Sequence, residues 1–366
     1  MERIETIVIG AGVIGLAAAR ALALQGQEVL ILEAESAIGA ATTARNSGVI
    51  HAGLYYPPAS HKARHCVQGR RLLYHYLRER SLPHRRCGKL IVAPPAQTAK
   101  LAEIAQRAEA AGVSDLVSLP AGAIAGYEPA VTGAAALFSP STGIVDVHEL
   151  IHSYLGDAEN KGATLALRSP VTGLALENGS FTVTVAGEAA MRLSCRNLVN
   201  AGGLHSQEIA RLLHGLPAAA IPPRHLAKGN YFSLKGAQPF THLVYPVPEP
   251  GGLGIHATLD LAGKTRFGPD VEWVDTLDYA VNPARAGHFY AAIRKYWPAL
   301  PDGALQPDYS GIRPKTSPPG AADTDFIIQS HTTHGIPNLV NLYGMESPGL
   351  TAALSIAAEI AAILKP

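Results

Sequence analysis

The chain has few cysteines, few aromatic residues and no basic tract. Its three cysteines, Cys66, Cys87 and Cys195, are widely spaced and odd in number, which argues against a disulfide framework or a cysteine zinc site and favours a reducing compartment. The 30 Lys and Arg residues nearly balance the 29 Asp and Glu residues, so no basic surface for nucleic acid is expected. We therefore expect a cytoplasmic protein with no nucleic-acid partner and no metal site.

The chain also lacks an apolar run that is typical of a membrane span. Residues 6–24 are almost all apolar or small, but spaced glycines and a following strand explain them as a buried unit. The last apolar stretch, residues 350–364, contains Glu359 and is short for a span. We expect a packed helix there, and peripheral contact with the inner face of a membrane stays open.

The most informative feature present is a dinucleotide-binding fingerprint near the start of the chain. An apolar strand leads into Gly10, Gly12 and Gly15, spaced as G-x-G-x-x-G, and an alanine-rich helix follows. A second apolar run then ends at Glu33. The glycines suit a tight turn, a close approach to pyrophosphate and close helix packing, while Glu33 suits the ribose hydroxyls. This context predicts a bound dinucleotide.

The order of predicted elements indicates two domains. The length of 366 residues exceeds that of most single domains, and the α/β pattern of the opening gives way to proline-rich and β-forming segments in the middle. We expect an α/β fold with a discontinuous Rossmann-like nucleotide-binding domain in residues 1–83, 140–216 and 315–366. A substrate domain with a mostly antiparallel sheet is expected in residues 84–139 and 217–314.

One segment of the expected substrate domain shows clean alternation. Residues 253–260 place apolar side chains at odd positions and His256 and Thr258 at even positions, which predicts a strand with one polar face. Residues 262–264 form a plausible hairpin turn into a second strand at residues 266–268.

Two further segments favour FAD over a nicotinamide dinucleotide. Residues 39–53 combine small residues, hydroxyls and Gly48 with Arg45, which suits a backbone held close to a large cofactor and a bound phosphate. Residues 344–351 form a turn rich in glycine and proline that opens a helix, whose positive N-terminal end suits the negative charge of a reduced flavin. An NAD-dependent dehydrogenase would leave both segments without a function.

Taken together, these segments resemble the FAD-dependent D-amino acid oxidase superfamily and, within it, L-2-hydroxyglutarate dehydrogenases and oxidases. His256-Ala257-Thr258 departs from that pattern, because Ala257 stands where a bulkier residue is expected. The similar stretches span nearly the whole chain, at residues 45–56, 62–69, 200–203, 228–232, 245–248 and 311–315.

The resemblance implies an FAD-dependent enzyme that oxidises a 2-hydroxy acid, with L-2-hydroxyglutarate as the expected substrate, and passes electrons to a quinone, another carrier or oxygen. It also extends the expected set of cofactor contacts. That set is Gly10, Gly12, Val13, Ile14, Gly15, Glu33, Ala34, Thr42, Thr43, Arg45, Asn46, Ser47, Gly48, Val171, Ala201, Gly202, Gly311, Arg313, Ser347, Pro348, Gly349, Leu350 and Thr351.

Oxidation of a hydroxy acid requires a base for the hydroxyl proton and a cation for the carboxylate. His51 and His256 are the candidates for the base, and the sequence does not choose between them. By resemblance, Arg313 clamps the substrate carboxylate, and a guanidinium suits that geometry. A dicarboxylate needs a second partner, for which Lys228, Tyr245 and Lys62 are candidates.

Other functions stay open at this point. An amino acid or amine oxidase acting on glycine, sarcosine or a D-amino acid could use the same scaffold and the same Arg313. Oxidation of glycerol 3-phosphate is disfavoured by the lack of a clear phosphate cluster. A non-catalytic flavoprotein is disfavoured by the His, Tyr and Arg residues gathered in the expected substrate domain.

Overall fold

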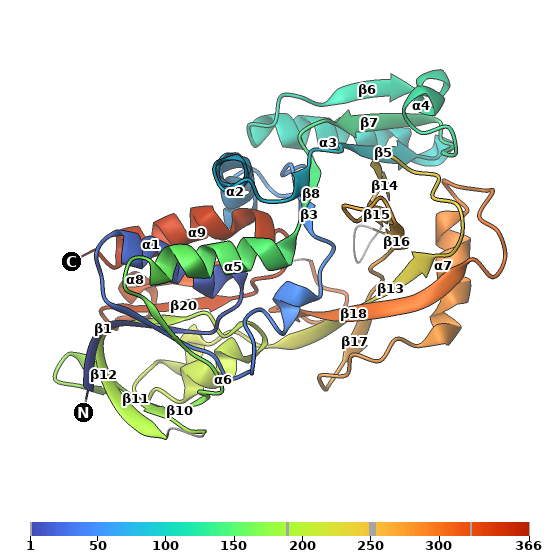
Figure 1. The fold of residues 1–366 in the computed structure, drawn as a ribbon. Helices are drawn as coiled ribbons and strands as arrows, with labels where there is room; N and C mark the ends of the chain where they lie inside the picture. Colours follow the sequence, from blue (N-terminus) through green and yellow to red (C-terminus); the bar gives the residue numbers. More distant parts are fainter. Residues whose placement is uncertain (1, 188–189, 249–253, 323, 366) are drawn as a thin grey trace.

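Two large β-sheets and a small third sheet organise the chain in the computed structural model, which describes residues 2–187, 190–248, 254–322 and 324–365 (Figure 1). The first large sheet has eight strands, drawn from both ends and the middle of the sequence. They are β1 (Glu2–Ile9), β2 (Val29–Leu32), β9 (Thr164–Ala166), β10 (Val171–Glu177), β11 (Ser180–Val185), β12 (Met191–Asn200), β19 (Ile327–Gln329) and β20 (Leu339–Tyr343).

The centre of this sheet is parallel, in the order β20-β12-β1-β2-β9, as expected for a βαβ nucleotide-binding unit. The hairpin β10–β11 adds to β12 in antiparallel fashion, and β19 pairs antiparallel with β20. One face is covered by a helical layer in which α1 contacts α5 and α9 (Figure 1). The helices of this layer are α1 (Val13–Leu24), α2 (His61–Glu79), α5 (Val147–Glu159) and α9 (Gly349–Ile363).

Small residues allow these helices to pack closely. The buried face of α1 includes Ala17, Ala18 and Ala19, none of which is exposed. Where α2 crosses α9, a Cβ atom on Gly69 would lie 2.3 Å from the backbone oxygen of Thr351. Glycine at this position therefore lets the two helices approach, which fixes the start of α9 beside the strands described below.

The second large sheet has nine strands and is antiparallel except for the parallel pair β14–β5. Its order is β17-β13-β16-β15-β14-β5-β7-β6, with β18 also paired to β13 along nine residues. The strands are β5 (Lys89–Ala93), β6 (Val117–Pro120), β7 (Ala135–Ser139), β13 (His225–Leu234), β14 (Leu243–Pro246), β15 (Ala257–Leu259), β16 (Thr265–Phe267), β17 (Glu272–Val274) and β18 (Leu305–Lys315).

The remaining elements border this sheet or connect the two. Helices α3 (Thr98–Ala110) and α4 (Ala121–Tyr127) contact β7, and α7 (Ala286–Ile293) contacts β18. Helix α6 (Ser206–Arg211) contacts β20 and the short α8 (His331–His334) contacts β19. The third sheet consists of β3 (Val49–Ile50), β8 (Gly143–Val145) and β4 (His84–Arg85). Strand β3 lies within the expected cofactor segment, residues 39–53, so this small sheet holds the last part of that segment.

The parallel and antiparallel sheets confirm the expected fold class. The expected strand at residues 253–260 is too long, because β15 covers only Ala257–Leu259 and residues 254–256 and 260 are not in a strand; Leu253 lies outside the described residues. The residues of the expected polar face, His256 and Thr258, are only 5% and 3% exposed, because β15 is enclosed between β14 and β16, and each of them lines a cavity. The turn at 262–264 is confirmed, with Gly263 N donating to Asp260 O. The division into two domains stays our prediction.

Candidate active site

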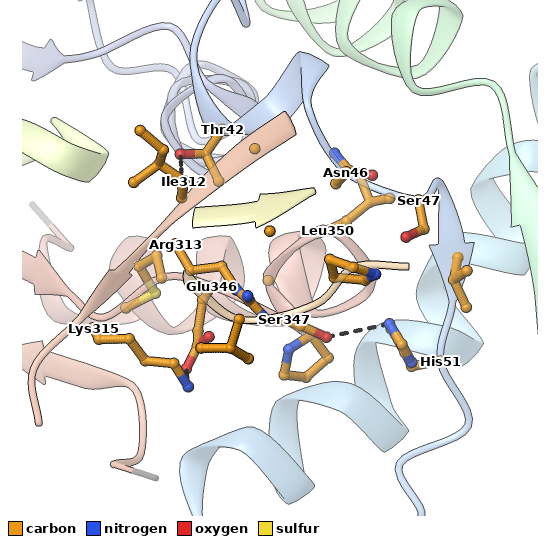
Figure 2. Close-up of a pocket in the computed structure, with 18 of the residues that line it drawn as sticks. Thr42, Asn46, Ser47, His51, Ile312, Arg313, Lys315, Glu346, Ser347 and Leu350 are labelled. Carbon is orange, nitrogen blue, oxygen red and sulfur yellow. Dashed lines mark hydrogen bonds and ion pairs between the residues drawn. The ribbon is translucent and has the colours of Figure 1, made fainter. Parts of the chain in front are cut away.

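A cavity of about 980 Å³ collects the motifs that the sequence singled out. Its walls come from the start of α1, the loop at residues 42–47, the exit of β3, strands β13 and β18, and the turn before α9 (Figure 2). The volume is at the upper end of the range for small-molecule and cofactor sites, about 300–1,000 Å³. Segments that are far apart in the sequence therefore form one ligand site.

The glycine-rich turn has the geometry that the fingerprint requires. Gly10 has a φ of 102°, and a Cβ atom there would lie 2.6 Å from the backbone oxygen of Ala201. A Cβ atom on Gly15 would lie 1.9 Å from the oxygen of Gly10, so only glycine allows this helix–strand contact. Gly12 and Val13 line the cavity at the N-terminus of α1, which is the part of a helix that binds anions.

The carboxylate of Glu33 lies beside this turn. One of its oxygens accepts a hydrogen bond from Ala11 N at 2.7 Å and the other accepts one from Glu35 N at 2.9 Å. The backbone of Glu33 also contacts the residues that lead into β10, because Ser169 N donates to the backbone oxygen of Glu33. This contact brings Val171 toward the fingerprint, although neither Glu33 nor Val171 lines the cavity itself.

The loop after Glu33 is fastened to β18 of the second sheet. Thr42 Oγ1 donates to the backbone oxygen of Ile312 at 3.2 Å, and Arg45 Nη1 donates to that of Ser310 at 3.3 Å. Between these contacts, a Cβ atom on Gly311 would lie 2.1 Å from the backbone oxygen of Arg45. The absence of a side chain at Gly311 thus lets the cofactor loop touch the substrate-side strand.

A cluster of charges stands at the turn before α9. The Glu346 carboxylate is within 3.0 Å of Lys62 Nζ and 2.8 Å of Lys315 Nζ. All three residues line the cavity, Lys62 and Glu346 are buried, and the Lys315 side chain is 11% exposed; Figure 2 shows Glu346 and Lys315. Two ammonium groups on one carboxylate leave a net charge of +1 at this wall. Lys62, a candidate for a second substrate carboxylate, is therefore already paired with Glu346.

His51 is held at the same turn. Its backbone N donates to Thr351 Oγ1 at 2.9 Å, and its Nε2 lies 3.2 Å from Ser347 Oγ. Enclosure in the protein lowers the pKa of His51 to about 3, and the charges of Lys89 and His256 contribute to this lowering. The ring is therefore neutral at neutral pH and has a nitrogen lone pair that can accept a proton.

His256 is the second neutral imidazole that lines the cavity. Burial lowers its pKa to about 3, and Lys89 and Arg313 act in the same direction against a raising contact with Gly254. In the neutral ring, Nδ1–H donates to the backbone oxygen of Gly254 at 3.0 Å, which leaves Nε2 as the acceptor. The ring of Tyr245 stacks on it with centroids 3.8 Å apart.

Arg313 lines the cavity and is fixed by backbone carbonyls. Its Nη2 donates to the oxygen of Asp270 at 2.6 Å, and its Nε donates to that of Ala227 at 3.2 Å. Lys228, by contrast, is not among the residues that line the cavity, and its ammonium pairs with Asp278 at 2.9 Å. We therefore do not retain Lys228 as a substrate-binding group.

The expected cofactor residues divide into those that face the cavity and those that support it. Fifteen face it, namely Gly12, Val13, Ile14, Thr42, Thr43, Arg45, Asn46, Ser47, Ala201, Gly311, Arg313, Ser347, Pro348, Gly349 and Leu350. Eight do not line it, namely Gly10, Gly15, Glu33, Ala34, Gly48, Val171, Gly202 and Thr351. Thr351 acts by bridging, since its hydroxyl accepts from His51 N and donates to the backbone oxygen of Val49.

Sequence reasoning missed Lys89, Tyr231 and Asp270. Tyr231 lines the cavity and its hydroxyl lies 3.0 Å from Ser47 Oγ, and Asp270 lines it opposite Arg313. Lys89 lies behind the cavity wall, with its ammonium 4.7 and 4.5 Å from the ring centroids of Tyr55 and Tyr245. Its position in an otherwise apolar strand, Lys89–Ala93, was the one signal available.

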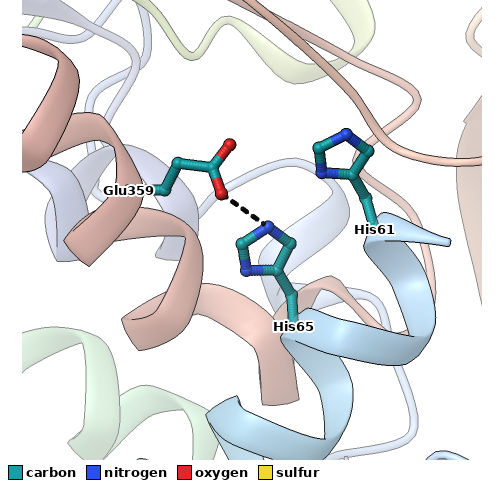
Figure 3. Close-up of side chains that lie close together, drawn as sticks. All are labelled: His61, His65 and Glu359. Atoms are coloured by element: carbon teal, nitrogen blue, oxygen red, sulfur yellow. Dashed lines mark ion pairs between the residues drawn. The ribbon is translucent and has the colours of Figure 1, made fainter. Parts of the chain in front are cut away.

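A cluster of potential metal ligands lies outside the cavity. His61, His65 and Glu359 place ligand atoms within 4.8 Å of one another (Figure 3). However, Nη2 of Arg64 is 3.1 Å from His61 Nδ1, 3.2 Å from His65 Nε2 and 2.6 Å from Glu359 Oε2. The guanidinium therefore occupies the position that a metal ion would need, so this cluster functions as a charge-assisted contact between α2 and α9.

With this geometry established, comparisons with known proteins assign the family. Residues 5–363 match the family of FAD-dependent oxidoreductases known as DAO. The chain belongs to this family. It is thus an FAD-dependent enzyme, and the expected resemblance and cofactor are confirmed. The residues present fit FAD, because Gly12 leaves room at the start of α1 and the helix start at Gly349 faces the same cavity.

Individual relatives support the same assignment. The mitochondrial L-2-hydroxyglutarate dehydrogenase of Arabidopsis thaliana is 45% identical over 401 residues, covering 98% of this chain and 83% of that protein. The L-2-hydroxyglutarate dehydrogenase of Escherichia coli (strain K12) is 29% identical and covers 97% of this chain and 92% of that protein.

A solved structure shares the fold. The dithionite-reduced L-α-glycerophosphate oxidase from Mycoplasma pneumoniae with FAD bound has a TM-score of 0.91 and 24% identity, covering 100% of this chain and 96% of that chain. None of the helices in the described ranges of our chain has the length and hydropathy of a membrane-crossing segment.

Proposed function

We propose that this enzyme oxidises L-2-hydroxyglutarate to 2-oxoglutarate. The observation that carries the proposal is one cavity in which two neutral imidazoles and the guanidinium of Arg313 meet the cofactor-binding segments. The 45% identity to the Arabidopsis L-2-hydroxyglutarate dehydrogenase along nearly the whole chain supports the choice of substrate.

The reaction removes a hydride from the α-carbon and a proton from the hydroxyl group, which leaves a carbonyl. FAD, when bound, supplies the two-electron acceptor for the hydride. Arg313 provides a fixed cation for the α-carboxylate, since three of its contacts with backbone oxygens orient its guanidinium. This orientation limits the poses in which the α-carbon can react.

We assign the role of base to His51. It follows the cofactor loop and touches Ser347 at the start of α9, so it stands among the segments that hold the cofactor. His256 belongs to the second sheet and is stacked under Tyr245, which places it on the substrate side. The neutral His51 ring accepts the hydroxyl proton as the hydride leaves.

Product formation from a panel of substrates tests the proposal. We expect a 2-oxo acid from L-2-hydroxyglutarate and none from its D-enantiomer, glycine, sarcosine, D-amino acids or glycerol 3-phosphate. Preferential turnover of an amine would instead establish the alternative, an amino acid or amine oxidase in which Arg313 holds the amino acid carboxylate.

The proposal is less specific about the electron acceptor and about where in the cell the protein is located. A quinone, another carrier or oxygen can reoxidise a flavin, and turnover with each acceptor in separate assays distinguishes them. We retain a cytoplasmic location, with peripheral contact at the inner face of a membrane as an extension. Cosedimentation with anionic vesicles tests that extension, and recovery of all protein in the supernatant would reject it.

A further inference from the structure

The wall of the cavity near Tyr245 contains an unusual set of polar groups. Tyr55 and Tyr245 both line the cavity, and their hydroxyl groups are buried without a hydrogen-bond partner among the described residues. Behind them lies Lys89, which is 1% exposed. Within the part of the chain that the structure describes, its ammonium has neither a carboxylate partner nor a hydrogen bond.

The buried Lys89 ammonium and the two buried hydroxyl groups destabilise the folded protein when no anion is bound beside them. A buried cation is destabilising unless it is paired, and buried hydroxyl groups are almost always hydrogen-bonded. The faces of two tyrosine rings at 4.7 and 4.5 Å from Lys89 Nζ compensate only part of this cost. Two donor hydroxyls and one cation at the same end of a ligand cavity together lack one anionic acceptor.

We propose that Lys89, Tyr55 and Tyr245 form the subsite for the second carboxylate of a dicarboxylic 2-hydroxy acid. The hydroxyl groups of Tyr55 and Tyr245 donate to the carboxylate, and the Lys89 ammonium behind the rings supplies the positive charge. This inference rests on the proposed function and specifies it, because the subsite selects dicarboxylates over monocarboxylates of equal length.

The position of Lys89 follows from the sheet topology. Strand β5 pairs in parallel with β14, in a register that sets Lys89 opposite Leu243 and Ile91 opposite Tyr245. Tyr245 stacks on His256, so the subsite adjoins an imidazole of the reaction cavity. Lys89 and Arg313 both act electrostatically on His256, so both cations lie near this imidazole. In the proposal, Arg313 binds the α-carboxylate and the Lys89 subsite binds the second carboxylate.

The charge of Lys89 depends on pH near neutrality. Burial lowers its pKa to about 7 in the absence of ligand, and the titratable groups that surround it are His51, Tyr55, Cys66, Tyr245 and His256. The ammonium form predominates below this pKa and binds the anion, whereas the neutral amine above it does not. Dicarboxylate binding should therefore weaken as the pH rises through about 7.

Equilibrium binding to the oxidised holoenzyme tests the subsite without turnover. Titrations followed by flavin absorbance compare 2-oxoglutarate with 2-oxopentanoate, which has the same length and lacks the second carboxylate. We expect Lys89→Met to raise the Kd of 2-oxoglutarate by about 10- to 100-fold, because the positive charge behind the two rings no longer attracts the second carboxylate. The Kd of 2-oxopentanoate should stay within about threefold, below the effect of one net hydrogen bond.

A second variant and a matched control guard against general damage. Tyr55→Phe removes only a hydroxyl group and should also weaken 2-oxoglutarate selectively. Tyr296→Phe removes another buried hydroxyl that has no partner among the described residues, in the turn after α7 and at a residue that does not line the cavity, and should change neither Kd. Equal losses for both ligands in Lys89→Met and Tyr55→Phe, or no loss in either variant, would overturn the subsite.

The pH dependence of ligand binding is an independent test of the subsite. From pH 6 to 8, the Kd of 2-oxoglutarate should rise in the wild type and stay flat in Lys89→Met, relative to 2-oxopentanoate. Failure of the proposed function would be seen separately, as a wild-type flavin that L-2-hydroxyglutarate does not reduce although 2-oxoglutarate binds.

Discussion

Replacing Gly311 with alanine tests how the cofactor loop is held. The added Cβ atom would stand 2.1 Å from the backbone oxygen of Arg45, well inside van der Waals contact. Strand β18 is paired to β13 along nine residues, whereas the loop at residues 42–47 is fastened by side-chain contacts. We therefore expect the loop to move and β18 to stay in place.

The size of the effect follows from the cost of overpacking. Inserting a methyl group into a closely packed site costs about 1–3 kcal/mol. If this cost is expressed in the loop conformation that binds FAD, the Kd of FAD rises about 5- to 150-fold. The melting temperature of the FAD-free protein should change little, because the loop can relax when no cofactor is bound.

The assay is titration of the FAD-free protein with FAD, followed by quenching of flavin fluorescence. Gly287→Ala is the matched control, since nothing lies within 4 Å of its added Cβ atom and its φ is not positive. A wild-type Kd for FAD in Gly311→Ala would refute the view that this close approach positions the cofactor loop. An equal weakening in Gly287→Ala would do the same.

Three other variants, with Glu359→Gln as a control for the last, address the substrate site and the charges around it. Arg313→Ala should raise KM about 10- to 100-fold through the lost carboxylate contact, with little change in FAD content, and loss of flavin at an unchanged KM would contradict this. His51→Asn should lower kcat by about 10²- to 10⁴-fold with the substrate Kd nearly unchanged, as measured by stopped-flow flavin reduction. The pKa of His51 is lowered to about 3, so its ring stays deprotonated around neutral pH. The pH profile of kcat/KM should therefore show no fall with an apparent pKa of 6–7 as the pH is lowered. Such a fall would reject His51 as the base. Glu346→Gln should lower the free energy of unfolding by about 3–5 kcal/mol because it removes the buried negative charge that pairs with the buried Lys62, whereas the more exposed Glu359→Gln should cost less than about 1 kcal/mol in urea denaturation.

The parts of the site that depend on local spacing could be predicted from the sequence. Gly10 and Gly15 are required by the backbone, because an added Cβ atom at either position would meet a backbone oxygen at short range. Gly12 follows the general pattern of βαβ units, in which this glycine leaves room for the pyrophosphate. The turn before α9 was likewise visible as a glycine- and proline-rich segment opening an apolar helix.

The parts that depend on long-range pairing could not be predicted. Lys89 begins a strand that is otherwise apolar, and only the parallel register of β5 with β14 brings it to Tyr245. The charge of Lys228 suits a substrate carboxylate. Its ion-pair partner Asp278, however, comes from a loop whose position no local sequence pattern specifies. Alternation at residues 253–260 predicted a polar face, but no local pattern showed that β15 lies inside the sheet, where His256 and Thr258 are little exposed and line cavities.

The most direct test of the account is anaerobic reduction of the bound flavin by L-2-hydroxyglutarate. Bleaching of the flavin band should be rapid with the L-enantiomer and absent with the D-enantiomer, because Arg313 and the Lys89 subsite fix both ends of the substrate beside His51. A flavin that stays oxidised with L-2-hydroxyglutarate, but is bleached by glycine, sarcosine or a D-amino acid, would contradict the proposed function.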